Sequence, residues 1–369
     1  MKTLVALFVA SVASSVSFAQ QKLDAFNSMK KSVDLRTGIC MSYVDTGSSN
    51  GTPVLLLHGY TDTSRSFQPL IEDLLRIDKG IRIIAPDLRG HGQSSMPDSC
   101  ECEMAPERCF TQAQLSADIL SLLDYLGISQ AHIVGHSIGS TIAQTIALQH
   151  PDRVFSMTLI GTCVNGKEAA TIHNFLIGDL IERDWKCTLE EERQVTWPQD
   201  AYSILPLNMG ERVMNYLKEN WVVEAGATEE FLDAIFPETL RVPLGTWIGA
   251  IRTLGEIDNR GALQKLRTPT LILWGEQDIV FGADDQEQVR SAFRSAAAKT
   301  GTKVIYKTYA QPLGEGVTGG PGHNFHWAAH KAVSQDIHNF IRNGSVTGAA
   351  TDKNGRVSLT SSDYYVELK

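Results

Sequence analysis

Residues 135–139, with the sequence GHSIG, hold a serine that has a glycine two positions before it and another two positions after it. An apolar run at 131–134 predicts a buried strand before this serine, and the apolar spacing of 141–148 predicts a helix after it. A serine on such a strand-to-helix turn is a nucleophile elbow. The glycines have no Cβ, so neighbouring backbone segments can approach the turn closely without a clash. The N-terminus of the helix stabilises the negative charge of a developing oxyanion. The pattern therefore predicts that Ser137 is a nucleophile.

Short apolar runs that alternate with helical patterns must position this serine. The predicted buried strands are 54–57, 81–85, 131–134, 154–160, 270–274 and 304–306. Alternation of strand and helix predicts an α/β fold with a mostly parallel sheet flanked by helices. Before the first buried strand, 32–36 and 39–44 flank Thr37-Gly38 and predict a β-hairpin.

The strand pattern stops for about a hundred residues after Ile160, and helical stretches rich in Trp, Tyr and Phe replace it. We expect a helical lid inserted between two sheet strands, above the elbow; the alternative is a helical subdomain that does not contact substrate. The predicted organisation is a signal peptide at 1–19, a core at 32–161, a lid at 162–261, the rest of the core at 262–343 and a loose tail at 344–369.

Composition limits the classes of partner. The chain has 369 residues, of which 43% are hydrophobic and 20% charged, with a net charge of −9. Lys and Arg are scattered, so neither nucleic acid nor an anionic membrane is an expected partner. Residues 1–19 combine Lys2, an apolar run and small residues, which predicts a signal peptide and secretion; a bipartite leader for an algal plastid is the alternative. No other stretch has membrane-spanning length, so no stable membrane insertion is expected.

Six cysteines are compatible with an oxidising compartment. A disulfide of Cys109 with Cys100 or Cys102 is one candidate, and Cys163 with Cys187 is a second. Cys40 completes the set, and the connectivity stays open at this stage. The cluster contains no C-x-x-C pair, so a zinc site is not expected.

Five motifs occur in a fixed order along the chain. They are His58-Gly59 after a buried strand, RGHGQS at 89–94, GHSIG at 135–139, Trp274-Gly275-x-x-Asp278 and Gly322-His323. Together, over about 33–342, they resemble the α/β-hydrolase fold, in the branch that includes carboxylesterases, epoxide hydrolases and haloalkane dehalogenases. This resemblance implies a sheet of about eight strands, a helical lid, and neither a metal nor an organic cofactor.

The resemblance also implies a catalytic triad in the order nucleophile, acid, base. Ser137 is the nucleophile by position, and Asp278 follows the strand where the family places its acid. The carboxylate would fix the tautomer of the base and stabilise its imidazolium form. Three other carboxylates stand near this strand end and fit the spacing less well: Glu276, Asp284 and Asp285.

His323 is the expected base, because it lies in a Gly-rich loop just before a helix, and His326 is the alternative. The expected oxyanion hole uses two backbone N–H groups, those of Ile138 and Tyr60. Three further histidines have no expected catalytic role. His58 and His91 should brace turns, and His136 should be a packing residue.

The nucleophile decides the reaction class. Relatives that open epoxides or carbon–halogen bonds place Asp at the elbow, whereas a serine deprotonated by histidine attacks an acyl carbon. We therefore expect a serine hydrolase that cleaves a small to medium apolar carboxylic ester through an acyl-enzyme, since the lid aromatics predict an apolar pocket. The alternatives are a carbon–carbon bond hydrolase, a cofactor-free dioxygenase and a non-catalytic, hydrolase-like ligand receptor. Substrate identity and oligomeric state do not follow from the sequence.

Overall fold

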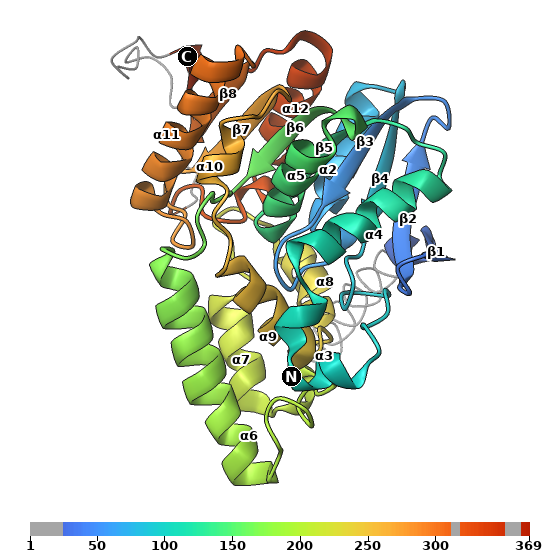
Figure 1. Ribbon diagram of the computed structural model, residues 1–369, viewed down its shortest axis with the longest axis vertical. Helices are drawn as coiled ribbons and strands as arrows, with labels where there is room; N and C mark the ends of the chain where they lie inside the picture. The colour runs from blue at the N-terminus through green and yellow to red at the C-terminus, as the bar shows by residue number, and fades with distance from the viewer. Residues whose placement is uncertain (1–24, 311–317, 351–362) are drawn as a thin grey trace, which may run out of the picture.

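A ten-stranded sheet forms the centre of the computed structural model, which describes residues 25–310, 318–350 and 363–369 (Figure 1). The spatial order of the strands is β1-β2-β4-β3-β5-β6-β7-β8-β10-β9. Their bounds are β1 (Lys30–Asp34), β2 (Cys40–Gly47), β3 (Thr52–Leu57), β4 (Ile81–Pro86), β5 (Ala131–His136), β6 (Val154–Ile160), β7 (Thr270–Gly275), β8 (Val304–Tyr309), β9 (Ala349–Ala350) and β10 (Tyr364–Leu368). The predicted leader at 1–19 lies outside the described residues.

The six central strands, from β4 to β8, are parallel, which confirms the α/β fold class. Their register aligns the carboxyl ends, since Leu57 pairs with Gly135, and His136 pairs with Ile160. Carboxyl ends of parallel strands share one edge of the sheet, and the loops that follow them usually carry the functional residues. The predicted hairpin is also present, as the antiparallel pair β1 and β2.

Helices cover both faces of the sheet, which explains why central strands such as β3 and β7 are mainly apolar. Along β3, Val54 and Leu56 pack towards α2 and α12, whereas Leu55 and Leu57 pack towards α4 and α5. This alternation is the period-2 geometry of a strand buried on both sides. The covering helices are α2 (Gln68–Ile77), α4 (Gln112–Tyr125), α5 (Ile138–Gln149), α11 (Ala283–Thr300) and α12 (His330–Asn343).

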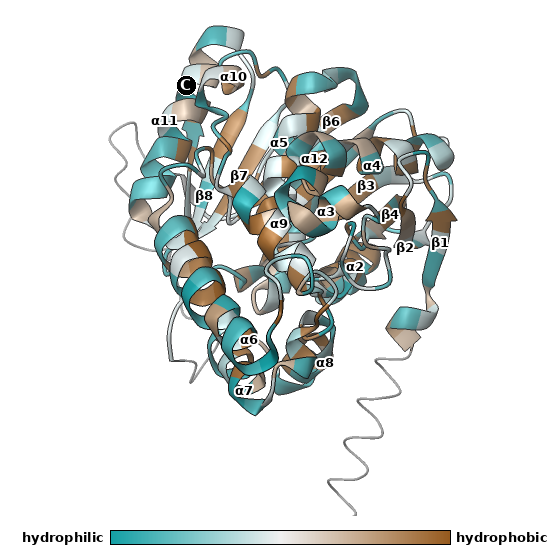
Figure 2. Cartoon of the chain, turned by 60° about the horizontal axis from the view of Figure 1, so that its bottom comes forward, coloured by the Kyte–Doolittle hydropathy of each residue, from teal (hydrophilic) through white to brown (hydrophobic). Residues whose placement is uncertain are grey.

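All named elements between β6 and β7 are helices, and they lie together beyond the carboxyl edge of the sheet (lower part of Figure 1). We call the segment 162–261 the lid. Its main helices are η4 (Thr171–Trp185), which continues into α6 (Lys186–Arg193), then α7 (Glu211–Asn220), α8 (Glu229–Thr239) and α9 (Leu244–Leu254). A β-bridge between Asn165 and Asp258 joins the two ends of the lid at its base. Helices α6 and α7 carry alternating hydrophilic and hydrophobic residues (Figure 2).

The shorter helices lie in the connections. They are η1 (Ser64–Phe67), α3 (Cys100–Met104), η2 (Pro106–Cys109), η3 (Pro151–Arg153), η5 (Pro206–Asn208), α10 (Arg260–Leu263) and η6 (Phe325–Trp327). None of the helices in the described ranges has both the length and the apolar character that a membrane span requires.

The C-terminal segment differs from the loose tail predicted at 344–369. Strand β10 pairs antiparallel with β8, and β9 pairs with β10, so the sheet has ten strands where about eight were expected. Two tyrosines and a valine give β10 a high strand propensity, and the pairing covers the otherwise open edge of β8. Thr347 ties the start of this segment to the core, because its N–H donates to Asp336 Oδ1 at 2.7 Å.

One disulfide is present among the described residues, between Cys102 and Cys109, with a Cα–Cα distance of 5.5 Å. This selects Cys102 over Cys100 as the partner of Cys109. The second expected pair is wrong, since Cys163 is a buried free thiol and Cys187 is an exposed one. Cys163 lies at the start of the lid segment, just after the end of β6, whereas Cys187 lies on the lid helix α6.

Candidate active site

Ser137 stands alone between the last residue of β5 and the first residue of α5, with φ 51° and ψ −120°. This backbone conformation costs a non-glycine residue on the order of 1–3 kcal/mol, and such strain is found mainly at functional sites. Two hydrogen bonds hold the turn: Ser137 N–H donates to Ile160 O at 2.9 Å, and Ser140 N–H donates to Ser137 O at 2.9 Å. The serine is therefore fixed at the N-terminus of α5, as expected for a nucleophile elbow.

The two glycines of the GHSIG motif are required by close backbone packing. A Cβ on Gly135 would lie 2.3 Å from Gly139 O, and a Cβ on Gly139 would lie 2.1 Å from Leu57 O. Neither contact can be relieved by a side-chain rotation, because the facing atoms belong to the backbone. The spacing of the motif thus follows from the crossing of α5 over the ends of β5 and β3.

Asp278 and His323 form the contact expected of an acid–base pair. His323 Nδ1 lies 2.9 Å from Asp278 Oδ2, and the Asp278 side chain is fully buried. The other carboxylate oxygen, Oδ1, accepts the N–H groups of Val280 at 2.8 Å and Phe281 at 3.0 Å. These two amides fix the orientation of the carboxylate, which in turn fixes the imidazole.

The electrostatic surroundings favour a protonated His323. Burial disfavours the imidazolium form, but the charge of Asp278 and its hydrogen bond outweigh burial, so the net effect is to raise the pKa of His323. Glu224 and Asp62 add further negative charge to its surroundings. This arrangement stabilises the imidazolium that forms when a base removes a proton from serine.

The alternative acids and the alternative base do not reproduce this contact. Glu276 and Asp284 are exposed, and Asp285 is half-buried. Among the described residues, neither ring nitrogen of His326 has a hydrogen-bond partner, and burial lowers the pKa of His326. His326 instead packs its ring against His136, with the two centroids 4.3 Å apart.

The two candidate oxyanion-hole amides come from loops that meet at the elbow. Ile138 is the first residue of α5, where an N–H group has no intrahelical acceptor. Tyr60 lies in the turn after β3, and no backbone acceptor for its N–H is found in the described part of the chain. The Tyr60 hydroxyl donates to Trp247 O at 2.6 Å, which anchors its side chain to the lid. Both amides are therefore candidates to hold an oxyanion, as expected from the sequence.

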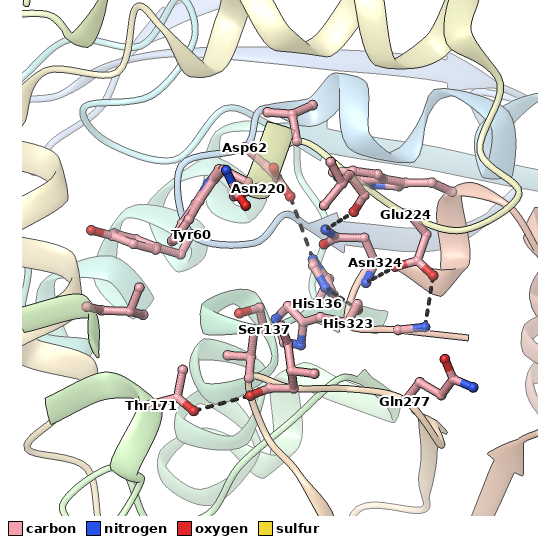
Figure 3. A pocket seen from close by; sticks show the side chains of 18 of the residues that line it. Tyr60, Asp62, His136, Ser137, Thr171, Asn220, Glu224, Gln277, His323 and Asn324 are labelled. Atoms are coloured by element: carbon pink, nitrogen blue, oxygen red, sulfur yellow. Dashed lines mark hydrogen bonds and ion pairs between the residues drawn. The ribbon is translucent and has the colours of Figure 1, made fainter. Parts of the chain in front are cut away.

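Ser137 and His323 line one cavity of about 580 Å³ between the core and the lid (Figure 3). Its wall is mainly apolar and comes largely from the lid. The apolar lining residues include Ile172, Phe175, Leu176, Trp221, Val222, Leu232, Ile251, Leu254, Val280 and Trp327. Apart from Ser137 and the histidines, the polar lining residues are Asp62, Thr171, Asn220, Glu224, Gln277 and Asn324.

The histidines expected to be structural make bracing contacts. Leu88 N–H donates to His58 Nε2 at 2.9 Å, and burial lowers the pKa of His58 to about 3. His91 Nδ1 lies 2.9 Å from Arg89 O. His136 does more than pack, since its Nε2 lies 3.1 Å from the backbone oxygen of His323. A buried side chain of the elbow thus supports the loop that carries the base.

Two lid residues at this site were not singled out from the sequence as site residues. Glu224 accepts hydrogen bonds from the loop of His323, and Trp221 Nε1 donates to Thr61 Oγ1 at 2.9 Å. Neither lies in a motif, and only the folded lid brings them to the core. The described residues contain no group of three or more His, Cys, Asp or Glu side chains arranged to hold a metal ion.

Comparisons with known proteins agree with the observed fold. A family model for the alpha/beta hydrolase fold matches residues 52–193. An esterase from Exiguobacterium antarcticum superposes with a TM-score of 0.61 and 17% identity, over 85% of this chain and 100% of the esterase. The chain has the alpha/beta hydrolase fold.

Relatives with this fold carry different activities in their names. An epoxide hydrolase of Caballeronia sordidicola is 38% identical over 124 residues, which is 33% of this chain and 34% of that protein. Lipase 1 of Psychrobacter immobilis is 23% identical over 248 residues, 67% of this chain and 69% of the lipase. The chain thus spans about a third of the length of the epoxide hydrolase that it matches. The relatives support a hydrolase of the alpha/beta fold and leave its substrate open.

Proposed function

We propose that this alpha/beta hydrolase is a serine hydrolase that cleaves a small to medium apolar carboxylic ester through an acyl-enzyme. The observation that carries the proposal is the strained Ser137 in the same cavity as a histidine held by a buried carboxylate. Asp278 occupies Nδ1 of His323, which leaves Nε2 to act as the base.

The proposed reaction has two halves. Ser137 Oγ attacks the ester carbonyl while His323 Nε2 takes the hydroxyl proton, and the N–H groups of Ile138 and Tyr60 stabilise the oxyanion. The imidazolium then protonates the leaving alcohol, and the acyl group stays on Ser137. Water attacks this acyl-enzyme with His323 as base, which releases the carboxylic acid and restores the serine.

The serine argues against epoxide opening, although several relatives are named epoxide hydrolases. A carboxylate that opens an epoxide forms an ester, which water can hydrolyse. A serine that opened an epoxide would form an ether, and the site offers no chemistry that cleaves it. Acyl transfer is therefore the reaction that Ser137 supports best.

The cavity supports the proposed substrate size and character. A volume of about 580 Å³ is within the usual range for small-molecule sites, and the lining from the lid is mainly apolar. An ester with one or two short apolar arms suits such a site better than a charged polymer.

The test is a panel of p-nitrophenyl esters of increasing acyl length, run beside a panel of aryl and alkyl epoxides. We expect ester turnover in the wild type and a loss of about 10⁴-fold or more in kcat for Ser137→Ala. The matched control is Ser129→Ala, because Ser129 is exposed and lies before β5. Epoxide opening without ester turnover, or full ester turnover by Ser137→Ala, would overturn the proposal.

A further inference from the structure

One carboxylate of the lid contacts the loop of the base on both sides of the histidine. Glu224, in the segment between α7 and α8, accepts the N–H of Gly322 at 2.8 Å and the N–H of Asn324 at 2.9 Å. These two amides are the immediate neighbours of His323 along the chain. Figure 3 shows Glu224 beside this loop, with both hydrogen bonds drawn. One oxygen of the carboxylate thus holds the chain before the histidine and the other holds the chain after it.

The fit between Glu224 and the loop is close. A Cβ on Gly322 would lie 2.9 Å from Glu224 Oε2, so a side chain at this position would crowd the carboxylate. Asn324 reaches back to the same lid segment, since its Nδ2 donates to Val223 O at 3.5 Å. Hydrogen bonds from backbone amides to a carboxylate are charge-assisted and stronger than those between neutral groups.

The same lid segment is also anchored on the opposite side of the site. Trp221 Nε1 donates to Thr61 Oγ1 at 2.9 Å, and Thr61 has a left-handed φ of 62° in the turn that carries Tyr60. The Trp221 ring packs edge-on against Tyr60, with centroids 5.8 Å apart. Segment 221–224 therefore connects the turn of a candidate oxyanion-hole amide with the loop of the candidate base.

We propose that Glu224 is a positioning residue for His323. Through Glu224, the lid holds the imidazole in the position from which it can accept the proton of Ser137. The kinetic part of this inference rests on the proposed function, because it takes His323 as the base of a serine hydrolase. Misplacing a catalytic group by about 1 Å can cost on the order of a hundredfold in rate. A carboxylate that fixes the chain on both sides of the base restricts such displacement.

Glu224 also acts on His323 by its charge. The titratable groups that face the carboxylate are His323 and Asp278 from core loops, and Asp62 acts on the same imidazole from the turn after β3. Burial raises the pKa of Glu224 to about 7, against the lowering effect of the Gly322 and Asn324 amides. Ionised Glu224 helps to keep the pKa of His323 raised. Below about pH 7 the carboxylate takes up a proton, which weakens both its hydrogen bonds and its effect on the imidazole.

Two substitutions separate geometry from charge. Glu224→Gln keeps the size of the side chain but removes the charge, and its NH₂ group must face one of the two amide donors. Glu224→Asp keeps the charge but is one methylene too short to reach both amides. The matched control is Glu219→Gln, which makes the same change at an exposed position of α7.

We expect kcat for ester hydrolysis to fall by about tenfold or more in both Glu224 variants and KM to change by less than about threefold, with Glu219→Gln unchanged. The acid limb of the kcat/KM profile should move to lower pH and become less steep in Glu224→Gln, whereas in Glu224→Asp it should stay near the wild-type position. The direction of the expected shift follows from the negative charge of Glu224, which raises the pKa of His323 in the wild type.

An NMR titration of the His323 imidazole, assigned by its loss in His323→Gln, gives a readout that does not depend on turnover. His323 should titrate at lower pH in Glu224→Gln than in the wild type. Wild-type kcat together with a wild-type imidazole titration in Glu224→Gln would overturn the inference. A wild type without ester turnover would instead refute the proposed function, and the imidazole titration would still decide the role of Glu224.

Discussion

The substitution Asp278→Asn tests the acid–base pair, because the structure predicts how the new amide would orient. The N–H groups of Val280 and Phe281 donate to Oδ1 at 2.8 and 3.0 Å. In the variant, these donors would hold the amide oxygen on their side and turn the NH₂ group towards His323 Nδ1. That nitrogen would then have to accept, so the imidazole proton would move to Nε2.

This tautomer cannot accept a proton from Ser137, since Nε2 already carries one. We expect kcat to fall by about 10⁴-fold, equivalent to about 5.4 kcal/mol in the activation free energy. We also expect the pKa of His323 to fall, because Asp278 is the largest influence that raises it. Residual activity should therefore persist to lower pH than in the wild type.

The assay is steady-state hydrolysis of a p-nitrophenyl ester from pH 5 to 9, with circular dichroism to verify folding. The matched control is Asp284→Asn, because Asp284 is an exposed carboxylate on the neighbouring helix α11 and was an alternative acid. Activity of Asp278→Asn within tenfold of the wild type would refute the tautomer argument. If Asp284→Asn lost activity while Asp278→Asn kept it, Asp284 would be the acid.

Three further predictions follow from the same site and its support. Gly161→Ala should lower kcat, and it should lower the melting temperature by several degrees. The reason is that Gly161 has φ +52° and that a Cβ there would lie 3.1 Å from the ring of His323. Activity assays and thermal melting scans check the two effects. Wild-type kcat/KM should fall as the pH drops through the raised pKa of His323, since the base must be neutral, and a pH–rate profile with no acid limb would contradict it. Replacing Cys102 and Cys109 by serine should lower the free energy of unfolding by about 2.5 kcal/mol, from the chain entropy of a loop of about eight residues; urea unfolding of variant and wild type measures it.

The parts of the fold that the sequence predicted are those with local signals. The strand and helix around Ser137 are adjacent in the chain, and β7 and the first half of β8 are apolar and buried. Asp278 was expected from the family resemblance, which places the acid after the strand that became β7. Residue pattern and chain order were sufficient for these elements, because turns at the ends of parallel strands meet at one edge of the sheet.

Other features depend on contacts between distant parts of the chain. Glu224 lies about a hundred residues before the amides that it binds, in a lid without any motif. Strand β10 follows a polar stretch, and only its pairing with β8 defines it. The partner of Cys109 depends on which sulfur reaches it in the folded chain, and Cys100 and Cys102 lie only two residues apart in the sequence. Local pattern carries no information on such long-range choices.

Covalent labelling by a fluorophosphonate tests the central claim most directly, because the reagent reacts with an activated serine when the serine oxygen displaces fluoride. After digestion, mass spectrometry of the wild type should find the phosphonyl group on the peptide that contains Ser137, with a parallel loss of ester turnover. Ser137→Ala should remain unlabelled, and Asp278→Asn should be labelled far more slowly. A wild type that hydrolyses esters while Ser137 stays unmodified would contradict the account.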